Sequence, residues 1–177
     1  QHSKGTLMGM TLIETIEVGS GGASSIEFTG IPQDATSLVL KISARNASAG
    51  FRSYRLQFNG ETGFTNPVYS MRGLGGDGSS TFNISEPNKS EFQISVQGTA
   101  TTANTFTSAE LMFSNYASST AKSASFEITT ENNATEAYAR LVAASYNNTS
   151  PITAIALSDS QLLVEHSTFS LYMITAD

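Results

Sequence analysis

Apolar and polar residues alternate with a period of two along most of this 177-residue chain, and this pattern constrains the fold more than any other feature. Between Glu91 and Val96, apolar side chains occupy every second position and polar side chains lie between them. Successive side chains of a β-strand point to opposite faces, so such a segment is typical of a strand with one buried face. The same reading applies to the segments 12–18, 25–29, 38–44, 53–58, 68–74, 107–114, 124–128, 152–157 and 168–174. The sequence therefore predicts an all-β fold.

Turn-forming residues separate these segments. Gly, Asn, Ser and Pro gather at 19–22, 31–32, 59–60, 73–78, 86–88 and 147–151. Asn-Gly and Gly-Gly pairs supply the positive φ angles of tight hairpins. Many short strands at this spacing predict an antiparallel two-sheet β-sandwich with a jelly-roll-like arrangement. No repeat or linker divides the chain, so we expect one domain over residues 11–177, preceded by an N-terminal arm of residues 1–10.

One segment is compatible with two structures. Residues 133–145 can be drawn as a capped helix with Ala137, Arg140, Leu141 and Ala144 on one face. They can also be drawn as a strand, because the segment lies between two strand-like stretches. We favour the strand.

Composition and charge exclude several classes of function. The chain has no cysteine, so neither a disulfide framework nor a thiolate zinc site can form. Its net charge is -6, and its nine Lys and Arg residues are scattered. Proteins that bind nucleic acid neutralise phosphates with clustered cations, so we expect neither DNA nor RNA as a partner. No apolar run reaches the length of about 20 residues that spans a bilayer. We also expect no redox cofactor.

The residues suited to catalysis are few. A nominal Ser, His and acid set can be written with Asp159, Ser160, Glu165 and His166, but no Gly-x-Ser-x-Gly elbow accompanies it. A glycosidase needs only two carboxylates, and most glutamates fall on the solvated faces of predicted strands, where solubility explains them. We therefore predict that the chain is not an enzyme.

Candidate binding residues are also sparse. The glycine-rich segment 73–78 offers a single carboxylate, Asp77, which falls short of a calcium loop, and we predict a flexible turn and no metal site. Aromatic side chains near loops are the usual platforms for sugars. Tyr69, Tyr116 and Tyr146 are therefore the candidates for contact with a glycan or a host surface. Their alternative is packing at the rim of the sandwich.

The order of several segments resembles a known family. The chain contains TLIETIEVGSGGASSIEFTGIPQDATSLVLKISAR (11–45), YRLQFNGETG (54–63), TENNATEAYARLVAASYNNTSPITAIAL (130–157) and HSTFSLYMITAD (166–177). In this order they resemble small virion proteins of tailed bacteriophages, especially phages of cyanobacteria and other aquatic bacteria. The chain departs from the family at Tyr172-Met173, where a Tyr-Gly pair is common, and this puts the end of the last strand in doubt.

The resemblance implies a β-sandwich virion protein of the head-decoration or tail-fibre type. The first hypothesis is a capsid decoration protein, assembled as a homotrimer, that binds the shell and gains avidity from many copies. Leu7, Met8 and Met10 would then be assembly contacts. The second hypothesis is a tail-fibre or spike domain that recognises a host glycan or protein. The third is a glycan hydrolase on the same scaffold.

Overall fold

The computed structural model describes residues 8–61, 66–132 and 136–176, and this part of the chain consists of β-strands joined by turns and loops. It contains no helix that is long and apolar enough to cross a membrane. In chain order the strands are β1 (Met8–Glu17), β2 (Ala23–Phe28), β3 (Ser37–Ala44), β4 (Arg52–Phe58), β5 (Tyr69–Gly76), β6 (Thr81–Lys89), β7 (Phe92–Val96), β8 (Thr107–Ser114), β9 (Lys122–Asn132), β10 (Glu136–Tyr146), β11 (Ile155–Leu163) and β12 (Thr168–Ala176).

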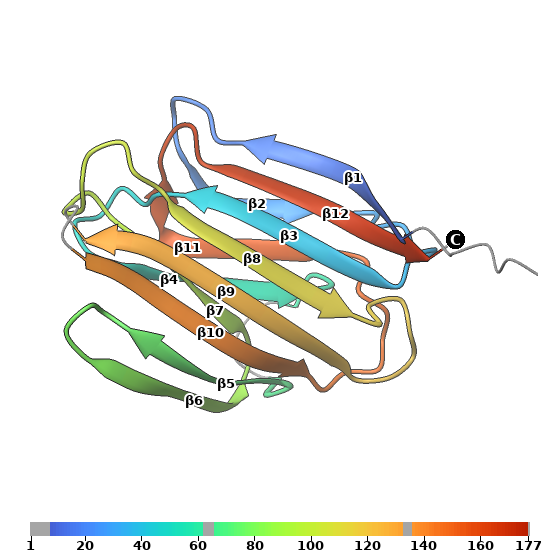
Figure 1. Cartoon of the computed structure of the whole chain (residues 1–177). Helices are drawn as coiled ribbons and strands as arrows, with labels where there is room; N and C mark the ends of the chain where they lie inside the picture. Colours follow the sequence, from blue (N-terminus) through green and yellow to red (C-terminus); the bar gives the residue numbers. More distant parts are fainter. Residues whose placement is uncertain (1–7, 62–65, 133–135, 177) are drawn as a thin grey trace, which may run out of the picture.

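The strands form two antiparallel sheets that pack face to face (Figure 1). The large sheet has eight strands in the order β1-β12-β3-β8-β9-β10-β5-β6. The small sheet has four strands in the order β2-β11-β4-β7 and lies behind it in Figure 1. The prediction of an all-β, two-sheet sandwich is therefore confirmed.

The strand order is that of a jelly roll with two inserted hairpins. When β5–β6 and β9–β10 are left aside, the remaining strands form the sheets β1-β12-β3-β8 and β2-β11-β4-β7, the order of a double Greek key. Both hairpins add to the same side of the large sheet, where β9 pairs with β8 and β5 pairs with β10. As a result the large sheet extends beyond the small sheet at β5 and β6, the lower part of Figure 1.

Aromatic side chains fill the space between the sheets. The ring of Phe58 lies 4.8–5.9 Å from the rings of Tyr69, Phe92, Phe113 and Tyr146, mostly edge to face. Edge-to-face contacts place the positive edge of one ring on the negative face of another, and each adds about 1 kcal/mol beyond the burial of apolar area. This cluster ties the inserted strand β5 to the jelly-roll core.

The strand prediction for residues 133–145 is confirmed over its described part, which belongs to β10. The prediction of a flexible turn at 73–78 is wrong in part, since residues 73–76 end β5. The strand β6 was not predicted, because Pro87 was read as a turn residue. Proline lacks the N–H of a sheet ladder, and β6 accepts it because β6 is an edge strand with a single neighbour.

Glycine at two positions of β5 lets other groups approach the sheet. A Cβ at Gly73 would lie 2.2 Å from the carbonyl oxygen of Leu141, and a Cβ at Gly75 would lie 2.2 Å from the ring of Phe82. Phe82 is the cross-strand partner of Gly75 and lies over it. Because Gly75 has no side chain, the Phe82 ring lies directly over its backbone and occupies the space that a larger side chain would take.

Candidate functional site

The three tyrosines chosen from the sequence are core residues. Tyr69, Tyr116 and Tyr146 are at most 1% exposed. The hydroxyls of Tyr69 and Tyr146 donate to the carboxylate of Glu61 at 2.6 and 2.8 Å, and Tyr116 donates to the carbonyl of Pro32. Because ring and hydroxyl are both occupied, none of the three offers a surface to a ligand. The prediction that these tyrosines contact a glycan or a host surface is therefore wrong, because they are buried in the core.

The predicted assembly contacts lie at the start of β1. Residues 8–10 pair with residues 176–174 of β12, so this part of the expected arm is a strand of the large sheet. The side chain of Met10 is exposed, while Leu7 lies outside the described residues. An edge strand at this position can contribute both side chains and backbone to a contact.

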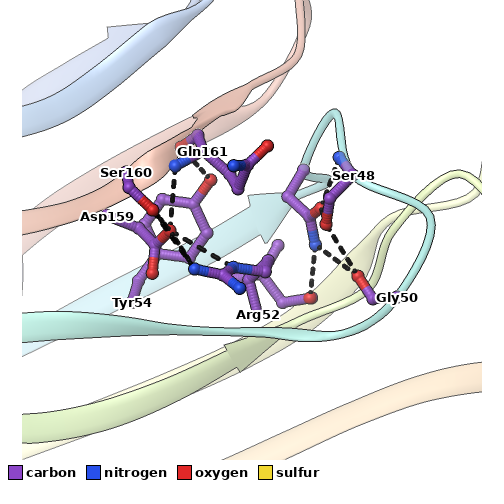
Figure 2. Close-up of polar contacts among 9 residues, drawn as sticks. Ser48, Gly50, Arg52, Tyr54, Asp159, Ser160 and Gln161 are labelled. Atoms are coloured by element: carbon purple, nitrogen blue, oxygen red, sulfur yellow. Dashed lines mark hydrogen bonds and ion pairs between the residues drawn. The ribbon is translucent and has the colours of Figure 1, made fainter.

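The nominal catalytic set is not brought together. The ring of His166 lies at the surface, with its Nδ1 3.1 Å from the carboxylate of Glu17. Ser160 makes its hydrogen bonds with Asp159 and Arg52 instead, as Figure 2 shows. In the described part of the chain no hydrogen bond joins His166 to Ser160, so the arrangement a Ser-His-acid nucleophile requires is not formed.

The group around Asp159 is a structural network (Figure 2). Its Oδ1 accepts from Arg52 Nη2 and from the backbone N–H of Gln161, each at 2.9 Å, and Tyr54 donates to the Gln161 carbonyl at 2.8 Å. Desolvation by burial favours the protonated acid, but the hydrogen bonds from Gln161 and Arg52 outweigh it and lower the pKa of Asp159. The network ties β4 to the irregular half of β11.

Two buried cations pin the loops at opposite ends of the strands. The guanidinium of Arg45, a residue 6% exposed, donates to the backbone carbonyls of Thr101, Thr102 and Thr105 at 2.8–3.1 Å. Lys122 is 2% exposed, and its ammonium donates to four backbone carbonyls at 2.7–3.3 Å. These acceptors belong to Ser118, Thr120, Asn148 and Ser150. Each buried cation therefore has its donors satisfied by backbone carbonyls and holds the loop segments that carry them together.

The outward side of the large sheet carries most of the exposed apolar side chains. We call it the outer face and define it by Met10, Leu12, Lys41, Arg72, Leu74, Glu110, Met112, Glu127 and Leu141. Six large apolar side chains are exposed in the described part of the chain, and four of them, Met10, Leu12, Leu74 and Leu141, lie here. Leu74 and Leu141 are cross-strand partners, 64% and 60% exposed. Beside them lies an open trough of about 460 Å³.

A second feature lies on the inward side, where the large sheet extends beyond the small one. Here a cavity of about 170 Å³ is lined by Phe51, Phe82, Thr130, Tyr138 and Arg140, among others, and we call it the Arg140 hollow. The rings of Phe51 and Tyr138 are 5.0 Å apart and stand together in its wall. A further hollow of about 200 Å³ adjoins it and shares Phe82 and Arg140.

Arg140 is held differently from the two pinning cations. Its guanidinium carbon lies 5.5 Å from the centre of the Phe82 ring. In the described part of the chain it forms neither an ion pair nor a hydrogen bond. Desolvation by burial lowers the pKa of Arg140. The sequence signal that could have identified this residue is a cation at a core-facing position, between Tyr138 and Val142, in an alternating strand.

The comparisons identify no relative. Models of known protein families, curated proteins and solved structures gave no match to the chain. Among the described residues, no group of three or more His, Cys, Asp or Glu side chains is placed to hold a metal ion.

Proposed function

We propose that this chain is a non-enzymatic structural protein of a bacteriophage virion, a capsid decoration protein that acts by multivalent protein–protein binding. The observation that carries the proposal is the pair Leu74 and Leu141, two exposed cross-strand neighbours that line an open trough on the outer face. Large contiguous apolar patches are uncommon on monomeric proteins and mark interaction surfaces. The family resemblance of the sequence supports the virion setting, whereas the jelly-roll architecture is shared by proteins of many functions and adds little.

The occupant that we propose for the outer face is a further copy of this chain. The face carries both signs of charge without pairing all of them: Lys41 contacts Glu110, while Arg72 and Glu127 form no ion pair in the described part of the chain. In a closed oligomer, Arg72 of one copy can meet Glu127 of the next, and Leu141 is then covered between them. The face is therefore complementary to itself in charge and in apolar surface.

Cryo-electron microscopy of the phage particle tests this function. We expect density for the sandwich in many symmetric copies on the capsid, with neighbouring copies in contact through the outer face. Density limited to a few copies at the tail would overturn the decoration role. Absence of the chain from purified particles would overturn the virion role altogether.

A second candidate is favoured by one specific observation, the Arg140 hollow. A tail-fibre or spike domain must hold a ligand of the host surface, and aromatic walls with a convergent polar group are the usual features of such pockets. Tail density in the same particle maps would support this function in place of decoration.

A further inference from the structure

We propose that the Arg140 hollow binds a carboxylate-bearing sugar, such as a uronic acid unit of a glycan, with the carboxylate on Arg140 and the ring against the aromatic walls. The site lies on the inward side of the large sheet, opposite to the outer face. The inference therefore does not depend on the oligomer or on the place of the chain in a particle.

The guanidinium of Arg140 has open donors. A guanidinium carries five N–H donors in a planar fork that matches a carboxylate in two parallel hydrogen bonds. One side of Arg140 is covered by Phe82, which leaves the edges of the fork for a partner. A half-buried cation without an anion is costly, and charged groups in such settings cluster at functional sites.

The carboxylates near the hollow are occupied by other donors. Asp77 lines the cavity, but its Oδ1 accepts from the backbone N–H groups of Ser79 and Ser80 at 3.1 and 2.7 Å. These hydrogen bonds lower the pKa of Asp77 and hold the carboxylate in its own turn. Glu86 lines the adjoining hollow and is paired with Lys89 at 2.8 Å. Neither neighbour neutralises Arg140.

The remaining wall of the hollow suits a hydroxylated ring. The Phe51 and Tyr138 rings offer apolar surface of the kind on which sugar rings stack. Thr130 lines the same cavity, and its hydroxyl is buried without a hydrogen-bond partner among the described residues. Ser95 adds a second hydroxyl to the wall. An unpartnered buried hydroxyl beside an unpartnered cation points to a ligand with both a carboxylate and hydroxyl groups.

Size limits the ligand to one ring at a time. An engineered apolar cavity of about 150 Å³ holds a benzene molecule, and the Arg140 hollow, at about 170 Å³, is of similar volume. The adjoining hollow of about 200 Å³ can take a neighbouring unit of a chain. The site therefore fits a single acidic sugar or one acidic unit of a glycan, and not a bulky ligand.

Titration of the full chain with sodium glucuronate, followed by calorimetry and by NMR of the labelled protein, tests the inference. We expect saturable binding with a Kd on the order of 1 mM, since one ion pair and one stacked ring are typical of weak single-sugar sites. Glucose has the same ring without the carboxylate, and it should bind at least about tenfold more weakly. The resonances of Phe82 and Thr130 should shift, and those of the outer face should not.

Two matched variants separate Arg140 from general charge. Arg140→Gln should weaken glucuronate binding at least about tenfold, because the bidentate pair is lost. Arg55→Gln makes the same change on β4 of the small sheet, at a residue that lines neither hollow, and it should leave the Kd unchanged. Far-UV circular dichroism confirms that both variants are folded. If Arg140→Gln does not fold, the NMR shifts of Phe82 and Thr130 and the comparison of glucose with glucuronate, both on the unmodified chain, test the inference.

The inference is overturned by any of three results: no saturable binding of glucuronate, equal binding of glucose and glucuronate, or equal binding by the Arg140→Gln variant. Inorganic phosphate is titrated in parallel. Tighter, Arg140-dependent binding of phosphate than of glucuronate would also overturn the proposal, because the site would then select an anion without a sugar ring.

Discussion

Arg45 and Arg140 both place a guanidinium next to the large sheet, where it is partly or wholly shielded from water, but their hydrogen-bond partners differ. Arg45 donates to three backbone carbonyls of one loop, so its charge is solvated by the protein itself. Arg140 has a phenyl ring on one side and no hydrogen-bond partner in the described part of the chain. A cation whose donors are satisfied within the protein therefore stabilises the fold, whereas one with open donors costs stability and suits a binding role.

The largest effect is expected from Arg45→Met, which keeps most of the apolar stem and removes every donor. The carbonyls of Thr101 and Thr105 would lose the guanidinium donor, while that of Thr102 would keep its hydrogen bonds from Thr105. We expect the free energy of unfolding to fall by about 4 kcal/mol, measured by urea denaturation followed by far-UV circular dichroism. A loss below about 1 kcal/mol would show that the loop does not depend on this residue.

Lys122→Met should cost about 3 kcal/mol for the same reason, since an ammonium with four carbonyl acceptors is replaced by a thioether. Lys41→Met is the matched control. Lys41 is half exposed and pairs with Glu110 on the outer face, so its replacement should change stability by less than about 1 kcal/mol. Equal losses in the two variants would contradict the assigned role of Lys122.

Alkaline pH tests the Glu61 cluster in the aromatic core. Desolvation by burial, aided by hydrogen bonds to Glu61, raises the pKa of Tyr69 and of Tyr146 above 10. A raised folded pKa means that stability is fully present below the unfolded pKa of about 10 and is lost as the pH rises above it, by up to about 1.4 kcal/mol per pH unit for each tyrosine. Urea titrations between pH 8 and about 11.5 should show this fall. They should show a smaller fall in the variant with both tyrosines changed to Phe, and an unchanged slope would refute the assignment.

The smallest effect is expected from Arg140→Met. The variant loses a cation–π contact worth about 1 kcal/mol and also loses the desolvation penalty of an unpaired guanidinium. We therefore expect a change of less than about 1 kcal/mol in either direction, from the same urea titration as for Arg45→Met. A loss as large as that of Arg45→Met would mean that Arg140 is a structural pin, and the comparison would fail.

The fold was largely predictable because most strands carry a local signal, the alternation of apolar and polar residues. The alternation at 38–44 and 107–114 sets both the strand and the face that it buries, and β3 and β8 follow it. The strand β6 was not predicted, because proline is disfavoured in a strand that pairs on both sides. The sequence around Pro87 does not show that β6 is an edge strand, which pairs on one side only.

The sites were not predictable in the same way, because they depend on pairs distant in the chain. Tyr146 lies beside a loop in the sequence, yet its hydroxyl partner Glu61 is 85 residues away. The Arg140 hollow draws on Phe51, Phe82 and Tyr138, which meet only because both inserted hairpins extend the same side of the large sheet. Periodicity can indicate to which face of a sheet a side chain points. It cannot indicate which distant residue contacts that side chain.

Sedimentation velocity of the full chain tests the central claim, that copies assemble through the outer face. We expect the unmodified protein to sediment as an oligomer, and the variant carrying Leu74→Asp and Leu141→Asp to sediment as a folded monomer at the same concentration. Leu162→Asp, a change at an exposed leucine of the small sheet, is the control and should remain oligomeric. A monomeric unmodified protein, or an oligomer that survives both aspartates, would contradict the account.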